Sequence, residues 1–188
     1  MTTASPAPVT VTHTAAAAKH PLVVAGLVLG IGMGGFIDGI LLHQLLQLHH
    51  MLSARRAPTN LLNVQVNMVW DGLFHLLTWT ATLIGIVLLF RAARRRDVAW
   101  SARTLAGAML AGWGLFNFVE GLIDHHVLHV HHVVERLGVS AYDYAFLASG
   151  VIFMLVGAVI VRGDRVAAAT AAAPGTADAP LSSGAVDR

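Results

Sequence analysis

Four long runs of apolar residues, each nearly free of formal charge, dominate the pattern of the chain. Asp38 and Asp71 are the only formal charges inside the first two runs, and Glu120 and Asp124 the only ones inside the third. A helix needs about 20 mostly apolar residues to cross the hydrocarbon core of a bilayer. The pattern therefore predicts an all-α, integral membrane four-helix bundle with spans near 22–48, 65–90, 104–129 and 143–162.

Composition supports lipid as the solvent for these helices. The 188 residues are 56% hydrophobic and only 12% charged, whereas a soluble domain carries about 25% charged residues. The segments 1–20 and 166–188 are rich in Ala, Thr, Pro and Ser without apolar periodicity, and we expect disordered tails there around a membrane domain at 21–165. The basic residues flank apolar runs, which excludes a nucleic-acid-binding face.

The basic residues also predict how the chain crosses the membrane. Four spans put both termini on one side, together with the eight Lys and Arg residues between 19 and 165 that lie there, against three on the other side. The positive-inside rule then places both tails in the cytoplasm and the loops 49–64 and 130–142 on the outward side. We expect the chain to lie in the inner membrane of a bacterium. Glycines at four-residue spacing in the first span predict close contact with another helix: Gly26, Gly30 and Gly34.

An internal repeat carries most of the histidines. Residues 36–50 (FIDGILLHQLLQLHH) align without a gap to residues 118–132 (FVEGLIDHHVLHVHH) at an offset of 82. The match pairs Asp38 with Glu120 and His43 with His125, which composition alone does not explain. We predict a duplicated helical hairpin whose first and third helices run in parallel. The fourth span has no histidine and no internal acid, and we expect it only to support the others.

Helical geometry gathers these polar groups toward the outer face. At 100° per residue, Asp38 and His49 share one stripe of the first span, and His43 and His50 share its neighbour. Ionisable groups inside a membrane usually mark a functional site, and imidazole with carboxylate suits copper(II), iron or zinc. The predicted metal ligands are Asp38, His43, His49, His50, Asp71, His75, Glu120, Asp124, His125, His129 and His132.

Several readings of this cluster stay open. His49, His50, His131 and His132 fit solvated interfacial histidines as well as ligands. The absence of cysteine excludes thiolate sites. Besides a metal-handling protein, the residues allow a membrane metalloenzyme with a dinuclear site, a proton-relay network, or a b-type cytochrome with haem between His43 and His125. Oligomeric state does not follow from the sequence.

The segments that carry the acids and histidines also resemble a known family. DGI…H…HHMLS, DGLFH and EGLIDHH…HH are similar to segments of a bacterial family of predicted membrane proteins of unknown function. The resemblance covers about 20–165 and implies four spans but no activity. Genes of this family often lie beside genes for cytochrome oxidase assembly, which implies respiratory oxidase assembly components as partners and copper as the metal.

Overall fold

A computed structural model describes residues 19–172, and within them every regular element is helical. The all-α prediction is confirmed, and four helices are long and apolar enough to cross a membrane. Helix α1 continues as the π-helix η1, and α3 continues as the π-helix η2, while η3 is a short 3₁₀ turn. The elements are α1 (His20–Ile37), η1 (Asp38–Leu45), α2 (Leu61–Ala93), α3 (Ala102–Glu120), η2 (Gly121–Val127), η3 (Glu135–Leu137) and α4 (Ala141–Ala172).

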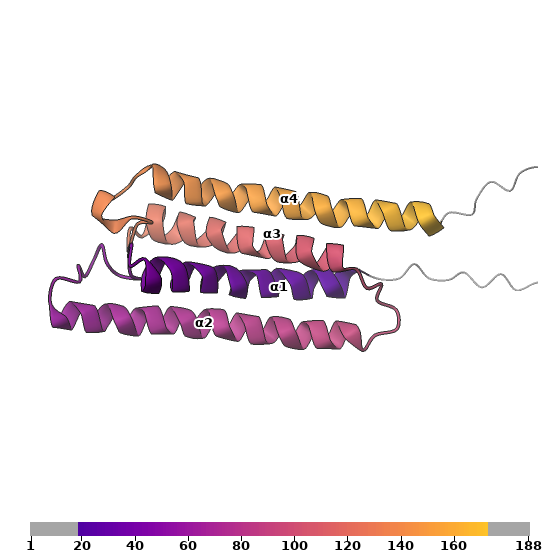
Figure 1. Ribbon diagram of the computed structural model, residues 1–188, viewed down its shortest axis with the longest axis horizontal. Coiled ribbons are helices and arrows are strands. Elements are labelled where there is room, and N and C mark those ends of the chain that lie inside the picture. The colour runs from indigo at the N-terminus through magenta and orange to yellow at the C-terminus, as the bar shows by residue number, and fades with distance from the viewer. Residues whose placement is uncertain (1–18, 173–188) are drawn as a thin grey trace, which may run out of the picture.

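The helices pack as a row in which α1 and α3 lie side by side in the middle (Figure 1). Helix α2 packs on the outer side of α1, and α4 on the outer side of α3. The α1–α2 and α3–α4 loops connect the helices at one end of the bundle, on the left in Figure 1, and the α2–α3 loop connects them at the opposite end. At that second end the Lys19 ammonium contacts the Asp164 carboxylate at 2.6 Å, and Asp164 also accepts a hydrogen bond from Thr104.

The two outer helices expose apolar side chains over most of their length. In the first span, half of the most apolar 18-residue stretch is buried inside the protein. In α2 and α4, only 17% of the corresponding stretch is buried. Large apolar side chains such as Leu77, Ile84 and Leu155 are at least half-exposed. Water would not tolerate so large an apolar surface, so these faces contact lipid in a multi-pass membrane protein.

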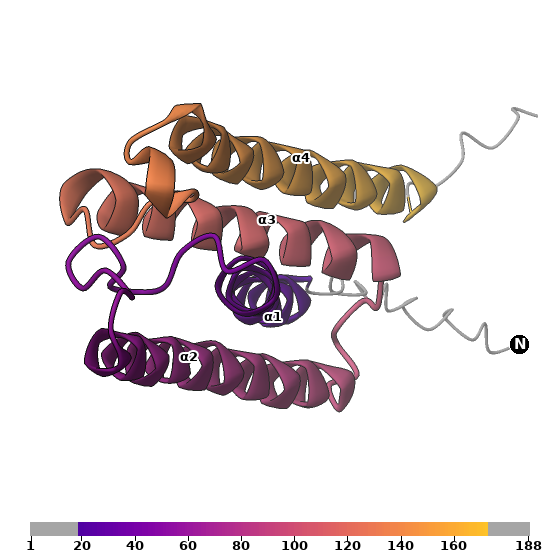
Figure 2. The same ribbon diagram turned by 60° about the vertical axis from the view of Figure 1, so that its left-hand side comes forward.

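Glycine allows α1 and α3 to touch, as the spacing predicted. A Cβ on Gly30 would lie 2.0 Å from the Met109 carbonyl oxygen, and a Cβ on Gly112 would lie 2.1 Å from the Leu27 carbonyl oxygen. Helix α1 is seen nearly end-on in Figure 2 while α3 is not, so the two helices cross at an angle. Small residues at a crossing let two backbones meet directly.

Two predicted boundaries need correction. The first span ends at Leu45 rather than near 48, because the chain leaves the helix and turns at Gln47, whose φ of 49° is left-handed. The tail expected from 166 is helical as far as Ala172, since the segment is rich in alanine, the strongest helix former. The rest of the two predicted tails, 1–18 and 173–188, lies outside the described residues.

Candidate metal centre

The two central helices each carry an acid and a histidine five residues apart where the helix widens. Asp38 opens η1, and its Oδ2 lies 3.1 Å from His43 Nε2. Glu120 precedes η2, and its Oε1 lies 3.4 Å from His125 Nε2. A π-helix bonds residue i to residue i+5, so side chains five residues apart come to one side of the helix. Both pairs are buried.

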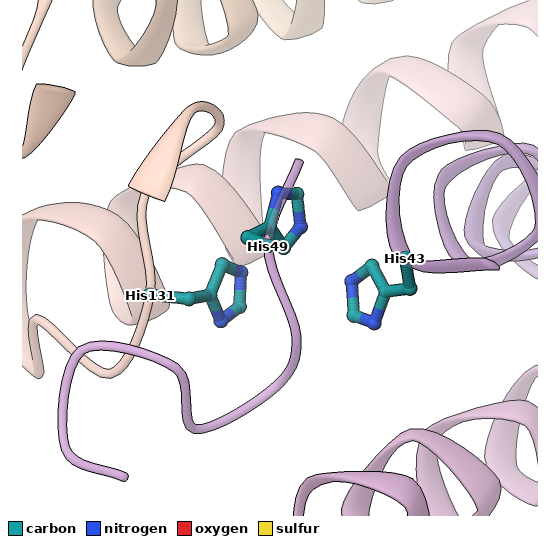
Figure 3. Close-up of side chains that lie close together, drawn as sticks. All are labelled: His43, His49 and His131. Atoms are coloured by element: carbon teal, nitrogen blue, oxygen red, sulfur yellow. The ribbon is translucent and has the colours of Figure 1, made fainter. Parts of the chain in front are cut away.

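Two loop histidines complete the cluster. Beyond η1 and η2 the chain turns back into the protein and buries His49 and His131 almost completely. Their rings stack with centroids 4.6 Å apart and planes 2° apart, and His43 faces both from the end of η1 (Figure 3). The His43 centroid lies 4.4 Å from His49, and the His125 centroid lies 4.8 Å from His131.

The stripes drawn from α-helical spacing were wrong for the loop histidines. His49, His50, His129, His131 and His132 all follow the last helical residue of their segment. Their positions are set by the two return turns at Gln47 and His129, which both have a left-handed φ, of 49° and 47°. A left-handed non-glycine residue is unfavourable by about 1 kcal/mol, and its cost here is offset by the packing of the returning loop.

Each loop histidine is oriented by the loop of the other hairpin. His49 Nδ1 lies 3.0 Å from the Val133 carbonyl oxygen, and His131 Nδ1 lies 3.2 Å from the Met51 carbonyl oxygen. An imidazole that donates from Nδ1 has its lone pair on Nε2. His131 Nε2 points to Glu120 Oε1 at 2.9 Å. The reciprocal bonds therefore fix the tautomer that presents Nε2 to the centre.

A second pair of acids holds the helical histidines from behind. Asp71 of α2 lies 3.0 Å from His43 Nδ1 and 2.7 Å from His50 Nδ1. Asp143 of α4 lies 3.3 Å from His125 Nδ1 and 3.5 Å from His132 Nδ1. Each acid also accepts a loop backbone N–H, from Met51 at 2.9 Å and from Val133 at 3.0 Å.

The inward-facing atoms are left without hydrogen bonds among the described residues. These atoms are the Nε2 atoms of His43, His49 and His125 and one carboxylate oxygen each of Asp38 and Glu120. An unsatisfied buried polar group costs about 1–3 kcal/mol. Two groups have ligand atoms within 4.8 Å of one another and could hold a metal ion: His43, His49 and His131, and Glu120, His125 and His131.

The distances suit metal ligation, and so does the protonation of His49, whereas a metal at His131 would have to displace a proton. The contacts of Asp38 and Glu120 with imidazole nitrogens run from 2.9 to 3.4 Å, and neighbouring ligands of a tetrahedral zinc lie about 3.4 Å apart. Burial lowers the pKa of His49 to about 2, which keeps that imidazole neutral. Burial also lowers the pKa of His131, but the hydrogen bond and charge of Glu120 outweigh it and raise that pKa.

The other predicted ligands lie outside the cluster. His50 and His132 contact the two rear acids, as described above. His75 donates from Nδ1 to the Asp71 carbonyl oxygen of its own helix at 2.8 Å. His129 is exposed, with its ring 5.8 Å from that of His132. Asp124 is half-buried, and its carboxylate makes no hydrogen bond within residues 19–172, although its backbone carbonyl accepts from the Val130 N–H at 3.0 Å.

Two central residues are absent from the predicted ligand set. His131 is the counterpart of His49 at the offset of 82, and that symmetry was the signal for including it. Asp143 contradicts the expectation that the fourth helix only supports the others. Its counterpart Asp71 is 72 residues away, not 82, because the second loop and helix start in a different register. At 72, Phe74 and Gly85 match Phe146 and Gly157.

A cavity connects the cluster with the loop end of the molecule. Its volume is about 960 Å³, and it is lined by polar and apolar residues of both loops, by the first part of α2 and by cluster residues. The lining includes His43 and His49 of the cluster, and His50 and Asp71 behind His43. An ion could therefore reach the buried imidazoles from the loop side without crossing the apolar helices.

Comparison with known proteins gives a family and no activity. The family model described as "Predicted membrane protein (DUF2243)" matches residues 25–164, which includes α2, α3, most of α1 and α4, and the whole cluster. No curated protein and no solved structure matches the chain.

Proposed function

This chain belongs to the DUF2243 family of predicted membrane proteins, and we propose that it binds a transition metal ion in the buried histidine cluster. It handles that metal at the outward-facing side of the membrane that it spans. One observation carries the proposal. Four buried imidazoles converge on two carboxylates, and each imidazole has its Nδ1 turned to an acceptor and its Nε2 toward the cluster. Such outer partners are typical of metal-ligating histidines.

The ligand set favours copper(II), iron or zinc. Imidazole suits these ions, whereas magnesium and calcium prefer oxygen ligands and copper(I) prefers thiolate or thioether sulfur. The chain has no cysteine. Copper handling in support of respiratory oxidase assembly is the specific role that the family resemblance favours. The cavity at the loop end supports a route by which such an ion enters and leaves.

We place the end with the α1–α2 and α3–α4 loops on the outward side of a bacterial inner membrane, and both tails in the cytoplasm. The contact between Lys19 and Asp164 supports a common side for the start of α1 and the end of α4. The excess of Lys and Arg on that side supports its cytoplasmic assignment. The centre then meets metal ions arriving from outside before they cross the membrane.

We also propose that the two hairpins arose by duplication. Equivalent features at the offset of 82 support this. The acid–histidine pair, the return turn and the loop-to-loop hydrogen bond each occur once in either hairpin. The contact of Gly30 with Gly112 supports an axis between α1 and α3, because these residues are themselves 82 apart.

A dinuclear metalloenzyme is the second candidate, favoured by the doubled acid–histidine pair. Two metal ions, each with its own carboxylate, would fit that symmetry, and an open coordination position would allow catalysis. Haem between His43 and His125 is disfavoured, because the rings of His49 and His131 occupy the space between them. His49 lies 4.4 Å from His43 and 6.2 Å from His125 by ring centroid.

Elemental analysis of detergent-purified protein tests the proposal. We expect stoichiometric copper, iron or zinc in the wild type and its loss in His49→Ala and His131→Ala. His75→Ala is the matched control, because that imidazole bonds to its own helix and its loss should leave the metal content unchanged. A wild type that stays metal-free after reconstitution with all three ions would overturn the proposal and favour a proton-relay network.

A further inference from the structure

A pocket of about 410 Å³ lies beside the centre, formed by α1, α2 and α3 together with the first loop. Its walls are almost wholly apolar, with Phe74 and Phe116 contributing aromatic rings 6.0 Å apart. Leu77, Leu115 and Val119 of the rim are among the exposed apolar side chains. Because such surfaces contact lipid in this protein, the pocket is reached from the bilayer rather than from water.

Two acids are among the residues that line this pocket. Glu120 and Asp124 are the only charged side chains that line it. Glu120 also contacts His125 and His131, so the pocket ends against the candidate metal centre. Asp124 makes no ion pair within the described residues. A carboxylate that lines an apolar pocket favours a molecule that brings a hydrogen-bond donor.

The equivalent position in the other hairpin is nearly filled. The counterpart pocket, which contains Asp38 and Phe146, measures only about 90 Å³. Trp113 stands there in place of Ile31, and its ring lies over Gly34, where an added Cβ would be 2.5 Å from Trp113 Cδ1. Leu42 stands there in place of Asp124. The two hairpins thus differ in the space beside the acid, which is Asp38 in one and Glu120 in the other, and in the second acid, Asp124, which only the open pocket has.

We propose that the open pocket binds a lipid-soluble phenol or quinol, with its ring against the two phenylalanines and its hydroxyl donating to Asp124 or Glu120. A flat ring suits aromatic walls, and the hydroxyl supplies the donor that the acids need. Phosphatidylcholine does not supply that donor, because neither its acyl chains nor its headgroup carries an N–H or O–H. The site rests on the proposed function only in lying against the metal centre.

Binding of a decyl-substituted benzohydroquinone to the full chain in phosphatidylcholine nanodiscs tests this. We expect saturable binding by calorimetry, and at least tenfold weaker binding of the dimethyl ether of the same probe, which lacks the donors. Two variants copy the closed hairpin: Ile31→Trp fills the space and Asp124→Leu removes the acid. Both should lose binding by at least tenfold, while Leu155→Trp on the lipid face of α4 should bind as the wild type does.

The metal content of the same samples separates this proposal from the previous one. Ile31→Trp and Asp124→Leu should keep the metal content of the wild type, and metal-free protein should still bind the probe through its acids. Absence of saturable binding to the wild type would overturn the pocket assignment whatever the metal content. Equal binding of the ether, or unchanged binding by Ile31→Trp, would also overturn it and leave a groove filled by acyl chains.

Discussion

The state of single residues decides whether the cluster can hold an ion. Each central imidazole has one nitrogen turned to an acceptor, a carboxylate for His43 and His125 and a carbonyl for His49 and His131. The other nitrogen is thereby aimed at the cluster. Orientation by a partner behind the ring raises ligand basicity and removes rotational freedom before an ion binds.

Removing one rear acid should weaken metal binding without removing a ligand. We expect Asp143→Asn to lower metal affinity by about 10–100-fold, because His125 loses the charge behind its Nδ1. The amide oxygen can still accept the Val133 N–H, so the loop should stay in place. Competition with a chromophoric chelator measures the change. Asp97→Asn, an exposed acid paired with Arg95, is the control, and equal affinities in the two variants would contradict the role of Asp143.

At the scale of elements, the π-helical ends explain what the sequence could and could not reveal. The repeat identified both acid–histidine pairs, but α-helical spacing separates residues five apart by about 140°. The structure joins Asp38 to His43 because the helix widens there, and no residue pattern announced that widening. The return turns at Gln47 and His129 were equally hidden, since neither is a glycine. Predicted stripes therefore misplaced the loop histidines.

The crossing of α1 and α3 gives a prediction at this scale. We expect Gly30→Ala to destabilise the protein by about 1–3 kcal/mol, the usual cost of overpacking, because the new methyl group would meet the Met109 backbone. Thermal unfolding in detergent measures it. Gly163→Ala is the matched control, since nothing lies within 4 Å of a Cβ there, and alanine should stabilise that helix by about 1 kcal/mol. Equal melting temperatures in the two variants would refute a tight crossing.

At the scale of the whole molecule, the sequence predicted the four spans and the parallel course of the first and third, but not the order in which the helices pack. Charge and hydropathy determine where a chain enters lipid. The row of α2, α1, α3 and α4 depends instead on which small residues face each other, such as Gly30 and Gly112, and on the fit of side chains around them. Periodicity alone does not contain that information.

Orientation can be measured directly, because the chain has no native cysteine. Arg94→Cys and Arg56→Cys remove the same charge at opposite ends of α2. We expect an impermeant maleimide added outside intact cells to label Cys at position 56 and to reach position 94 only after lysis. Labelling of position 94 in intact cells would reverse the proposed topology and move the centre to the cytoplasmic face.

The reciprocal bonds of His49 to Val133 and of His131 to Met51 have a consequence for ancestry. In each hairpin, the carbonyl oxygen that orients the loop histidine belongs to the other hairpin. Under the duplication proposed above, the ancestral hairpin could build this centre only by pairing with an identical copy, and every approach to the centre then came in two identical versions. Fusion into one chain let a tryptophan close one approach while the other stayed open, which turned a symmetric centre into one with a front and a back.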